Sequence, residues 1–171
     1  MLLDNPAYLT HCRWMERAIS LAQAAGEAGE VPVGAVVVFE GRAIATAENR
    51  RERDHDPTAH AEILALRDAG QVLQTWHLTE CTLYVTLEPC PMCSGALILA
   101  RLGTLVYGAD DLKAGAIRSV LNLPDSDCSN HRFPVIGGIL EYSCKRQLHD
   151  WFAKRRLRDK NPPHDTPESV P

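Results

Sequence analysis

The chain has 171 residues, which suits a single domain, and its hydrophobic (45%) and charged (23%) fractions are ordinary for a globular protein. No apolar run approaches the ~20 residues that a bilayer span requires, and the start of the chain lacks the basic and apolar segments of a secretory signal. These features favour a cytoplasmic protein, in which six cysteines are reduced thiols or metal ligands rather than disulfides.

The first 47 residues predict a helix followed by a β-hairpin. Asn5-Pro6 is typical of a helix N-terminus, and apolar residues at helical spacing continue to about Gly26. The hairpin comprises the β-branched run 33–39, the turn signal Glu40-Gly41 and the segment 42–47.

Helices and strands alternate over the rest of the chain. Thr58 is the predicted cap of a helix that runs to about Asp68 and is closed by Gly70. Further elements are predicted as strands at 82–87, 104–107 and 135–136 and as helices at 91–100 and from about 140 into a basic segment. This alternation predicts an α/β protein with helices on both faces of one sheet. We expect one domain over 1–160 and a disordered tail over 161–171, where proline and polar residues prevail.

Charge is unevenly distributed. The window from Cys144 to Lys160 holds seven basic and two acidic residues, so it carries +5, and the rest of the chain, with −4 overall, carries −9. A basic C-terminal helix on an acidic body is able to hold a phosphate backbone. The alternative is a solvated helix end whose positive charge favours the helix dipole.

His60, Cys90 and Cys93 form the strongest chemical signal. Pro91 is suited to a first helical position, which puts Cys90 at the cap and Cys93 in the first turn, with both sulfurs on one face. A helix N-terminus favours the thiolate, and two thiolates with an imidazole suit zinc. Three protein ligands leave a fourth tetrahedral position for water, as catalytic zinc sites do.

Glu62 lies two residues beyond His60, so on a helix it points away from the histidine and need not be a ligand. It is able to stand beside a zinc-bound water and to move protons, a role that typically contributes about 10²- to 10⁴-fold in rate. The alternative is a glutamate favoured at a helix start by the dipole.

The pattern His-x-Glu followed by Pro-Cys-x-x-Cys resembles the cytidine/deoxycytidylate deaminase superfamily, and residues 11–158 resemble its bacterial tRNA-specific adenosine deaminases. The segments that carry the resemblance are 31–36, 56–63, 83–90, 107–111 with Lys113, 130–132 and 151–156. Ile117-Arg118 and Leu148-His149 depart from that pattern.

This resemblance implies a cytidine deaminase-like three-layer α/β/α sandwich around a mixed sheet. It also implies one Zn²⁺ per subunit, held by His60, Cys90 and Cys93, with Glu62 moving protons. The implied substrate is the wobble adenosine in the anticodon arm of a tRNA, an arginine tRNA, and the implied assembly is a homodimer.

Three RNA contacts are further expected from the resemblance. Asn49 matches a residue that contacts the flipped base, and its amide has both a donor and an acceptor for a purine edge. Asp111 matches a loop at the RNA entrance, where a carboxylate accepts from a ribose 2′-hydroxyl. Arg155, beside the aromatic pair Trp151-Phe152, is a candidate for phosphate contact. The alternatives are a turn residue, an ordinary loop acid and a helix anchored by its aromatics.

Two rival functions remain at this stage. A deaminase of free guanine or cytosine shares the zinc motif but has no need of the basic helix. A zinc-stabilised binding protein without catalysis requires a fourth protein ligand, for which Cys81, Cys128 and His131 are candidates.

Overall fold

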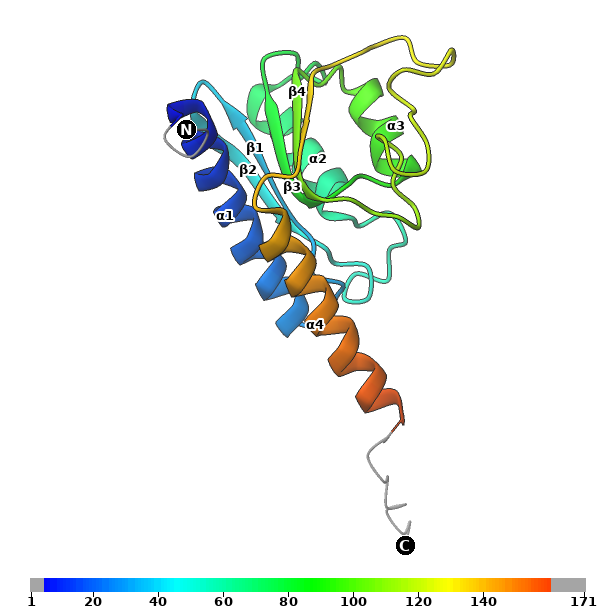
Figure 1. Cartoon of the computed structure of the whole chain (residues 1–171). Coiled ribbons are helices and arrows are strands. Elements are labelled where there is room, and N and C mark those ends of the chain that lie inside the picture. Colours follow the sequence, from blue (N-terminus) through cyan, green and yellow to red (C-terminus); the bar gives the residue numbers. More distant parts are fainter. Residues whose placement is uncertain (1–4, 161–171) are drawn as a thin grey trace, which may run out of the picture.

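The computed structural model describes residues 5–160, and they form three layers (Figure 1). Helices α1 (Pro6–Glu27) and α4 (Glu141–Lys160) cover one face of a central sheet, while α2 (Ala61–Leu73) and α3 (Pro91–Leu99) cover the other. The predicted three-layer α/β/α sandwich is therefore confirmed. None of the described helices combines the length and the apolar character needed to cross a membrane.

The sheet is mixed and has the strand order β2-β1-β3-β4-β5. Its strands are β1 (Gly34–Phe39), β2 (Arg42–Glu48), β3 (Thr82–Leu87), β4 (Thr104–Ala109) and β5 (Val135–Gly137). β1 is antiparallel to both β2 and β3, whereas β3, β4 and β5 run parallel. The parallel strands are joined by crossovers, so the carboxyl ends of β3 and β4 meet at one edge, as ligand sites of α/β sheets require.

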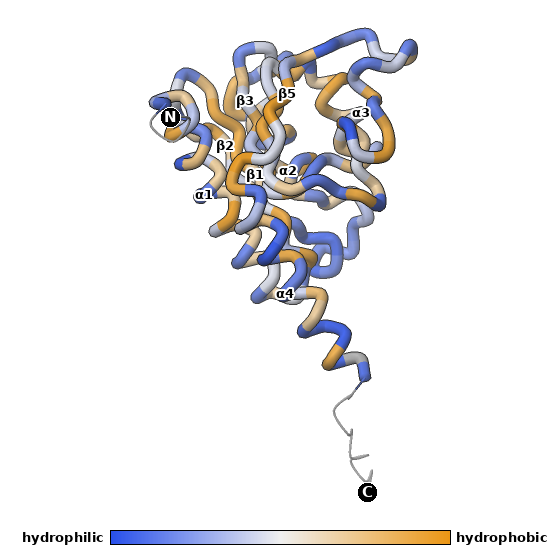
Figure 2. The backbone as a smooth tube through the Cα atoms, viewed as in Figure 1, coloured by the Kyte–Doolittle hydropathy of each residue, from blue (hydrophilic) through white to orange (hydrophobic). Residues whose placement is uncertain are grey.

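Both faces of the central strands are buried, which explains why β1 and β3 are apolar without alternation. Alternate residues of β1 and β3 point to two separate cores. The core beneath α2 and α3 includes Val37, Leu83 and Val85, and the core beneath α1 and α4 includes Val36 and Tyr84. Figure 2 shows that the strands are largely apolar, whereas α4 is largely polar.

The predicted first helix and hairpin are confirmed. The side chain of Asn5 accepts a hydrogen bond from the amide of Ala7 at 2.9 Å, as a helix cap does, and Pro6 takes the first helical position. β1 pairs with β2 across the Glu40-Gly41 turn, where both residues have positive φ.

The predicted boundaries of the second helix are wrong. Thr58 does not cap it, because its amide and hydroxyl both donate to Oδ1 of Asp56 in a turn. Helix α2 instead begins after His60 and continues through Gly70 to Leu73, where Gln74 adopts a left-handed conformation (φ 54°) and ends it. The helix passes Gly70 because burial of its apolar face outweighs the weak helix propensity of one glycine.

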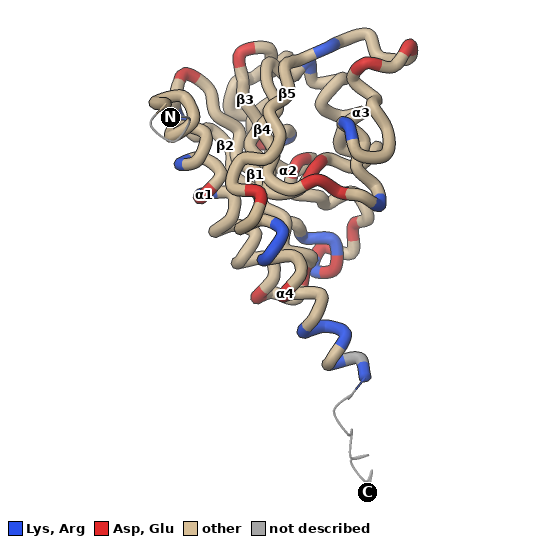
Figure 3. The backbone as a smooth tube through the Cα atoms, in the orientation of Figure 1, with Lys and Arg blue, Asp and Glu red and all other residues tan. Residues whose placement is uncertain are grey.

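The predicted disordered tail, 161–171, lies outside the described residues. The last described helix, α4, lies beside α1 and ends in a run of Lys and Arg (Figures 1 and 3). Trp151 attaches it to α1, because its indole Nε1 donates to the carbonyl of Gly26 at 3.1 Å.

Candidate metal centre and active site

Two helix N-termini face each other at the carboxyl end of β3. His60 is the N-cap residue of α2, Cys90 is the N-cap residue of α3, and Cys93 lies buried in the first turn of α3. Neither cap side chain makes a capping hydrogen bond, so the imidazole and the thiol are left for the site between the helices. The unsatisfied amides of both helix starts favour negative charge there.

The three candidate ligands converge. The Sγ atoms of Cys90 and Cys93 lie 3.7 Å and 3.5 Å from Nδ1 of His60, and all three ligand atoms lie within 4.8 Å of one another. In a tetrahedral zinc site with Zn–S and Zn–N bonds of about 2.3 Å and 2.0 Å, a sulfur and a nitrogen are about 3.5 Å apart. The donor set and its spacing therefore fit a zinc ion held through Nδ1.

The candidates for a fourth protein ligand lie elsewhere. Among residues 5–160, the group able to hold a metal contains His60, Cys90 and Cys93 and no other side chain. Nε2 of His131 lies 2.8 Å from the carbonyl oxygen of Leu102, and the thiol of Cys128 lies 3.1 Å from the hydroxyl of Ser126. A closed four-ligand site, as the binding-protein alternative requires, is not formed by the described residues.

The two thiols have opposite electrostatic surroundings. The pKa of Cys90 is lowered to about 4, chiefly by a hydrogen bond from Cys93 and also by one from His60. The pKa of Cys93 is raised, because it shares that hydrogen bond and because it is buried. The hydrogen bond to Cys90 raises the pKa of His60. One thiolate is thus stable in the protein alone, and a divalent cation supplies the charge that a second thiolate needs.

Glu62 stands beside this group without belonging to it. It lies in the first turn of α2, only 4% of its surface is exposed, and it lines the same cavity as His60 and Cys90. Burial raises the pKa of its carboxyl group. A carboxyl group whose proton affinity is increased in this way is suited to both accepting and returning a proton.

A cavity of about 170 Å³ leads to the candidate ligands. Its walls come from the segment before β1, the end of β2, the end of β3 and the segment after β4. Among the predicted RNA contacts, Asn49 and Asp111 line it, together with Val31, Val33, Arg51, Leu87, Glu88 and Ala114. The backbone amide of Asn49 donates to the carbonyl of Val33 at 2.9 Å, which holds the backbone of Asn49 at the cavity wall.

Arg155 is not brought to this cavity. It lies on α4 with its guanidinium 5.3 Å from the ring centre of Trp151, and it lines a different pocket of about 210 Å³ with Lys154 and Arg158. Trp151 is partly buried against α1, whereas Phe152 is 41% exposed. Trp151 thus contacts α1 as the anchoring alternative expects, and the RNA contact of Arg155 stays a prediction.

Two buried carboxylates near the site had no predicted role. Glu30 accepts hydrogen bonds from the amides of Glu52 and Arg53, at 3.2 and 2.8 Å, and so holds the loop after Asn49. Glu88 lines the cavity directly. For Glu88 the sequence signal is an acidic residue directly after an apolar strand. Such a residue is either exposed or buried in a hydrogen-bonded network, and the sequence does not distinguish the two.

Comparisons with known proteins agree with this geometry. The family model described as MafB19-like deaminase matches residues 9–156. The tRNA-specific adenosine deaminase of Bacillus subtilis is 45% identical over 147 residues, which cover 86% of this chain and 91% of that protein. The chain belongs to the tRNA-specific adenosine deaminases.

Solved structures resemble this deaminase as well. A structure from a study of A-to-I editing by tRNA:A34 deaminases superimposes with a TM-score of 0.77 and 42% identity, over 79% of this chain and 98% of that one. A guanine deaminase from Nitrosomonas europaea superimposes with a TM-score of 0.69 and 30% identity, over 82% and 83% of the two chains. Membership of this family makes the chain a hydrolytic deaminase, and the nearer likeness is to the tRNA enzymes.

Proposed function

We propose that this deaminase converts the wobble adenosine of a tRNA anticodon to inosine, with one zinc ion per chain. The observation that carries the proposal is the approach of two thiols to Nδ1 of His60, at 3.7 and 3.5 Å, beside a buried carboxyl group in one cavity. Bound zinc supplies Lewis acidity, which makes water more acidic and more nucleophilic at neutral pH.

Glu62 moves the protons of the reaction. Its carboxylate accepts a proton from the attacking water as oxygen bonds to C6 of the adenine, and it delivers that proton to N1. It then carries the second proton of the water to the amino group, so that ammonia leaves and the C6 carbonyl of inosine forms. Water and adenosine thus yield inosine and ammonia without any other reactant. The raised pKa of the buried Glu62 favours both proton transfers.

Three residues bind the RNA in this proposal. The Asn49 amide, at the cavity wall, meets the edge of the flipped base with a donor and an acceptor. The Asp111 carboxylate accepts from a ribose 2′-hydroxyl, a group that DNA lacks. Arg155 contacts a phosphate outside the cavity, on the basic end of α4 (Figure 3). An anticodon loop is a favourable target because its bases are already partly unstacked.

The direct test incubates the protein with an anticodon stem-loop of an arginine tRNA that has adenosine at the wobble position, and measures inosine by nuclease digestion and chromatography. We expect inosine from this RNA and none from a stem-loop with guanosine there. Glu62→Gln is the control, because it preserves shape and should retain zinc while losing turnover. Ammonia released from free guanine or cytosine, with none from the stem-loop, would instead favour the free-base deaminase to which the Nitrosomonas europaea structure points.

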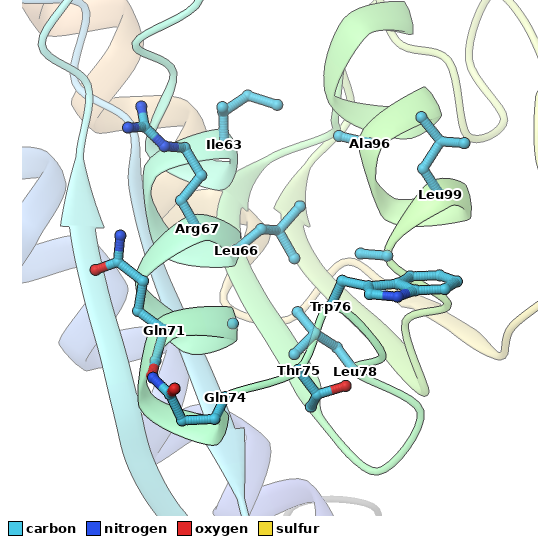
Figure 4. A pocket seen from close by; sticks show the side chains of 12 residues that line it. Ile63, Leu66, Arg67, Gln71, Gln74, Thr75, Trp76, Leu78, Ala96 and Leu99 are labelled. Carbon is cyan, nitrogen blue, oxygen red and sulfur yellow. The ribbon is translucent and has the colours of Figure 1, made fainter.

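A homodimer is also part of the proposal. An apolar groove of about 760 Å³ runs between α2 and α3, on the sheet face opposite α1 (Figure 4). Along it, the side chains of Leu99 and Trp76 are 70% and 61% exposed. Exposed apolar surface of this kind marks an interface, and a second copy of the chain is the occupant that we propose.

Sedimentation velocity tests the dimer. Leu99→Glu introduces a charge into the groove and should convert dimers to monomers with unchanged far-ultraviolet circular dichroism. Leu9→Glu is the matched control, because Leu9 is 51% exposed on α1, across the sheet from the groove. A wild-type protein that sediments as a monomer at all concentrations would contradict this part of the proposal. A cytoplasmic location is the last part of the proposed function.

A further inference from the structure

Glu88 is a buried carboxylate that takes no part in the proposed proton transfers. It follows the last residue of β3, two residues before Cys90, and only 1% of its surface is exposed. An ionised carboxylate so deeply buried is costly unless donors surround it. The hydrogen-bond donors that surround the Glu88 carboxylate therefore indicate its role.

Within residues 5–160, all of the donors to the Glu88 side chain come from one segment, residues 111–119. Oε1 accepts from the amides of Ile117, Arg118 and Ser119 at 3.1, 2.7 and 2.9 Å. Oε2 accepts from the amide of Asp111 at 3.0 Å and from the hydroxyl of Ser119.

This segment contains no helix or strand, so the sheet and helices do not satisfy its amides. Four of its backbone amides donate to the Glu88 carboxylate instead, and the backbone lies close around this group. A Cβ atom at Gly115 would lie 2.3 Å from Oε2 of Glu88 and 2.6 Å from the carbonyl oxygen of Asp111. Only glycine permits this approach. The segment is held by its hydrogen bonds to Glu88 together with a backbone hydrogen bond, from the amide of Ala116 to the carbonyl of Pro89 at 2.9 Å.

The same segment forms one wall of the catalytic cavity. Asp111 and Ala114 line it, together with Asn49 and His60. The Asp111 carboxylate is itself fixed, since it accepts from the amides of Lys113 and Ala114 at 2.9 and 3.1 Å. Movement of the segment would therefore move a substrate-facing carboxylate relative to the metal ligands.

We infer that Glu88 is a positioning residue, which fixes segment 111–119 against the metal-binding start of α3 and thereby sets the affinity for the target nucleoside through Asp111. The inference rests on the proposed function, which it deepens. As a positioning residue, Glu88 does not contact the reacting atoms. It controls where the RNA-facing wall stands, and the proton transfers of Glu62 proceed without it.

Glu88→Gln tests the inference, because the amide preserves size but turns an NH₂ group toward one set of N–H donors. We expect zinc to stay at one ion per chain, the KM for the stem-loop to rise about tenfold, and kcat to change by less than about threefold. Gly115→Ala should raise KM similarly, because its methyl group displaces the same segment while leaving Glu88 intact. Should Glu88→Gln fail to fold, Gly115→Ala and the milder Ser119→Ala provide the same comparison.

A double-mutant cycle shows whether the effect passes through Asp111. In the Asp111→Ala background, adding Glu88→Gln should change KM by less than about twofold, since the group being positioned is gone. Met15→Ala is the stability control, because Met15 is fully buried in the other core, and it should lower the melting temperature without raising KM. An unchanged KM in both Glu88→Gln and Gly115→Ala, or effects of Glu88 and Asp111 that multiply, would overturn the inference.

Binding of a fluorescent stem-loop separates this inference from the proposed function. If the wild type forms no inosine, the proposed function fails, while the dissociation constant still reports whether Glu88→Gln weakens RNA binding about tenfold. If inosine forms and Glu88→Gln binds and turns over RNA as the wild type does, the inference alone fails.

Discussion

Gly34 lies where α1 crosses β1, and its replacement by alanine should strongly destabilise the fold. A Cβ atom there would lie 2.1 Å from the carbonyl oxygen of Ala18, 2.7 Å from the amide nitrogen of Ala22 and 2.8 Å from Cβ of Leu21. Contacts of Cβ atoms are essentially never shorter than 3.0 Å, so the helix must move outward by about 0.9 Å, the difference between 3.0 and 2.1 Å. Two of these atoms belong to the backbone, so no change of rotamer relieves the overlap.

The expected cost follows from the packing that such a movement loosens. Met15, Ala18, Ala22 and Ala25 form the fully buried face of α1, and overpacking of this kind costs about 3 kcal/mol. For a chain of this length, each kcal/mol lowers the melting temperature by about 2–4 °C, so we expect a decrease of roughly 6–12 °C.

Thermal unfolding followed by circular dichroism, at saturating zinc and equal protein concentration, measures this decrease. Ser20→Ala is the matched control, since Ser20 lies on the exposed face of the same helix and its replacement should change stability by no more than about 0.5 kcal/mol. A Gly34→Ala protein that melts within about 2 °C of the wild type would refute the reasoning.

Three further predictions concern the metal, one buried phenol and the basic helix. Cys93→Ala removes one of three ligands, so zinc per chain measured by mass spectrometry should fall well below one, and inosine formation should fall at least about 10²-fold. Burial raises the pKa of Tyr84 from 10.0 to about 12, so its neutral form is favoured by folding. The contribution of neutral Tyr84 to the free energy of unfolding should be complete below pH 10 and lost between about pH 10 and 12. An absorbance titration that does not differ from that of Tyr84→Phe in this range would contradict this prediction. Arg155→Ala should weaken stem-loop binding and reduce the slope of log K against log salt by about one, whereas an unchanged slope would mean that Arg155 contacts no phosphate.

Most elements and the candidate metal ligands were predictable because local rules govern them. Asn5 and Pro6 indicate a helix start, because the asparagine side chain caps it and proline has the φ of a first helical residue. A strand covered on both faces has an unbroken apolar run. Cys90 and Cys93 share a helix face because of their spacing alone. The pairing of the cysteines with His60 came from the chemistry of zinc and from the family pattern, and the structure brings the three side chains together.

Other features required the fold. The error at Thr58 arose because Asp56 competes for its hydroxyl, a choice between two local hydrogen bonds that the sequence leaves undecided. The sequence predicts Arg155 as an RNA contact, yet it lies on α4 outside the cavity that His60 and Glu62 line, because the packing of Trp151 on α1 sets the position of that helix.

By itself the sequence determined which groups are available for chemistry: an imidazole and two thiols at helix starts, with a glutamate nearby. Tertiary structure decided how the cavity around them is walled, because the segment 111–119 has no periodicity of its own and is held largely by Glu88, a carboxylate that is distant from it in the chain. Local propensity acts over a turn of helix or a strand pair. The position of such a segment depends instead on burial of a charge, whose cost only the complete fold imposes.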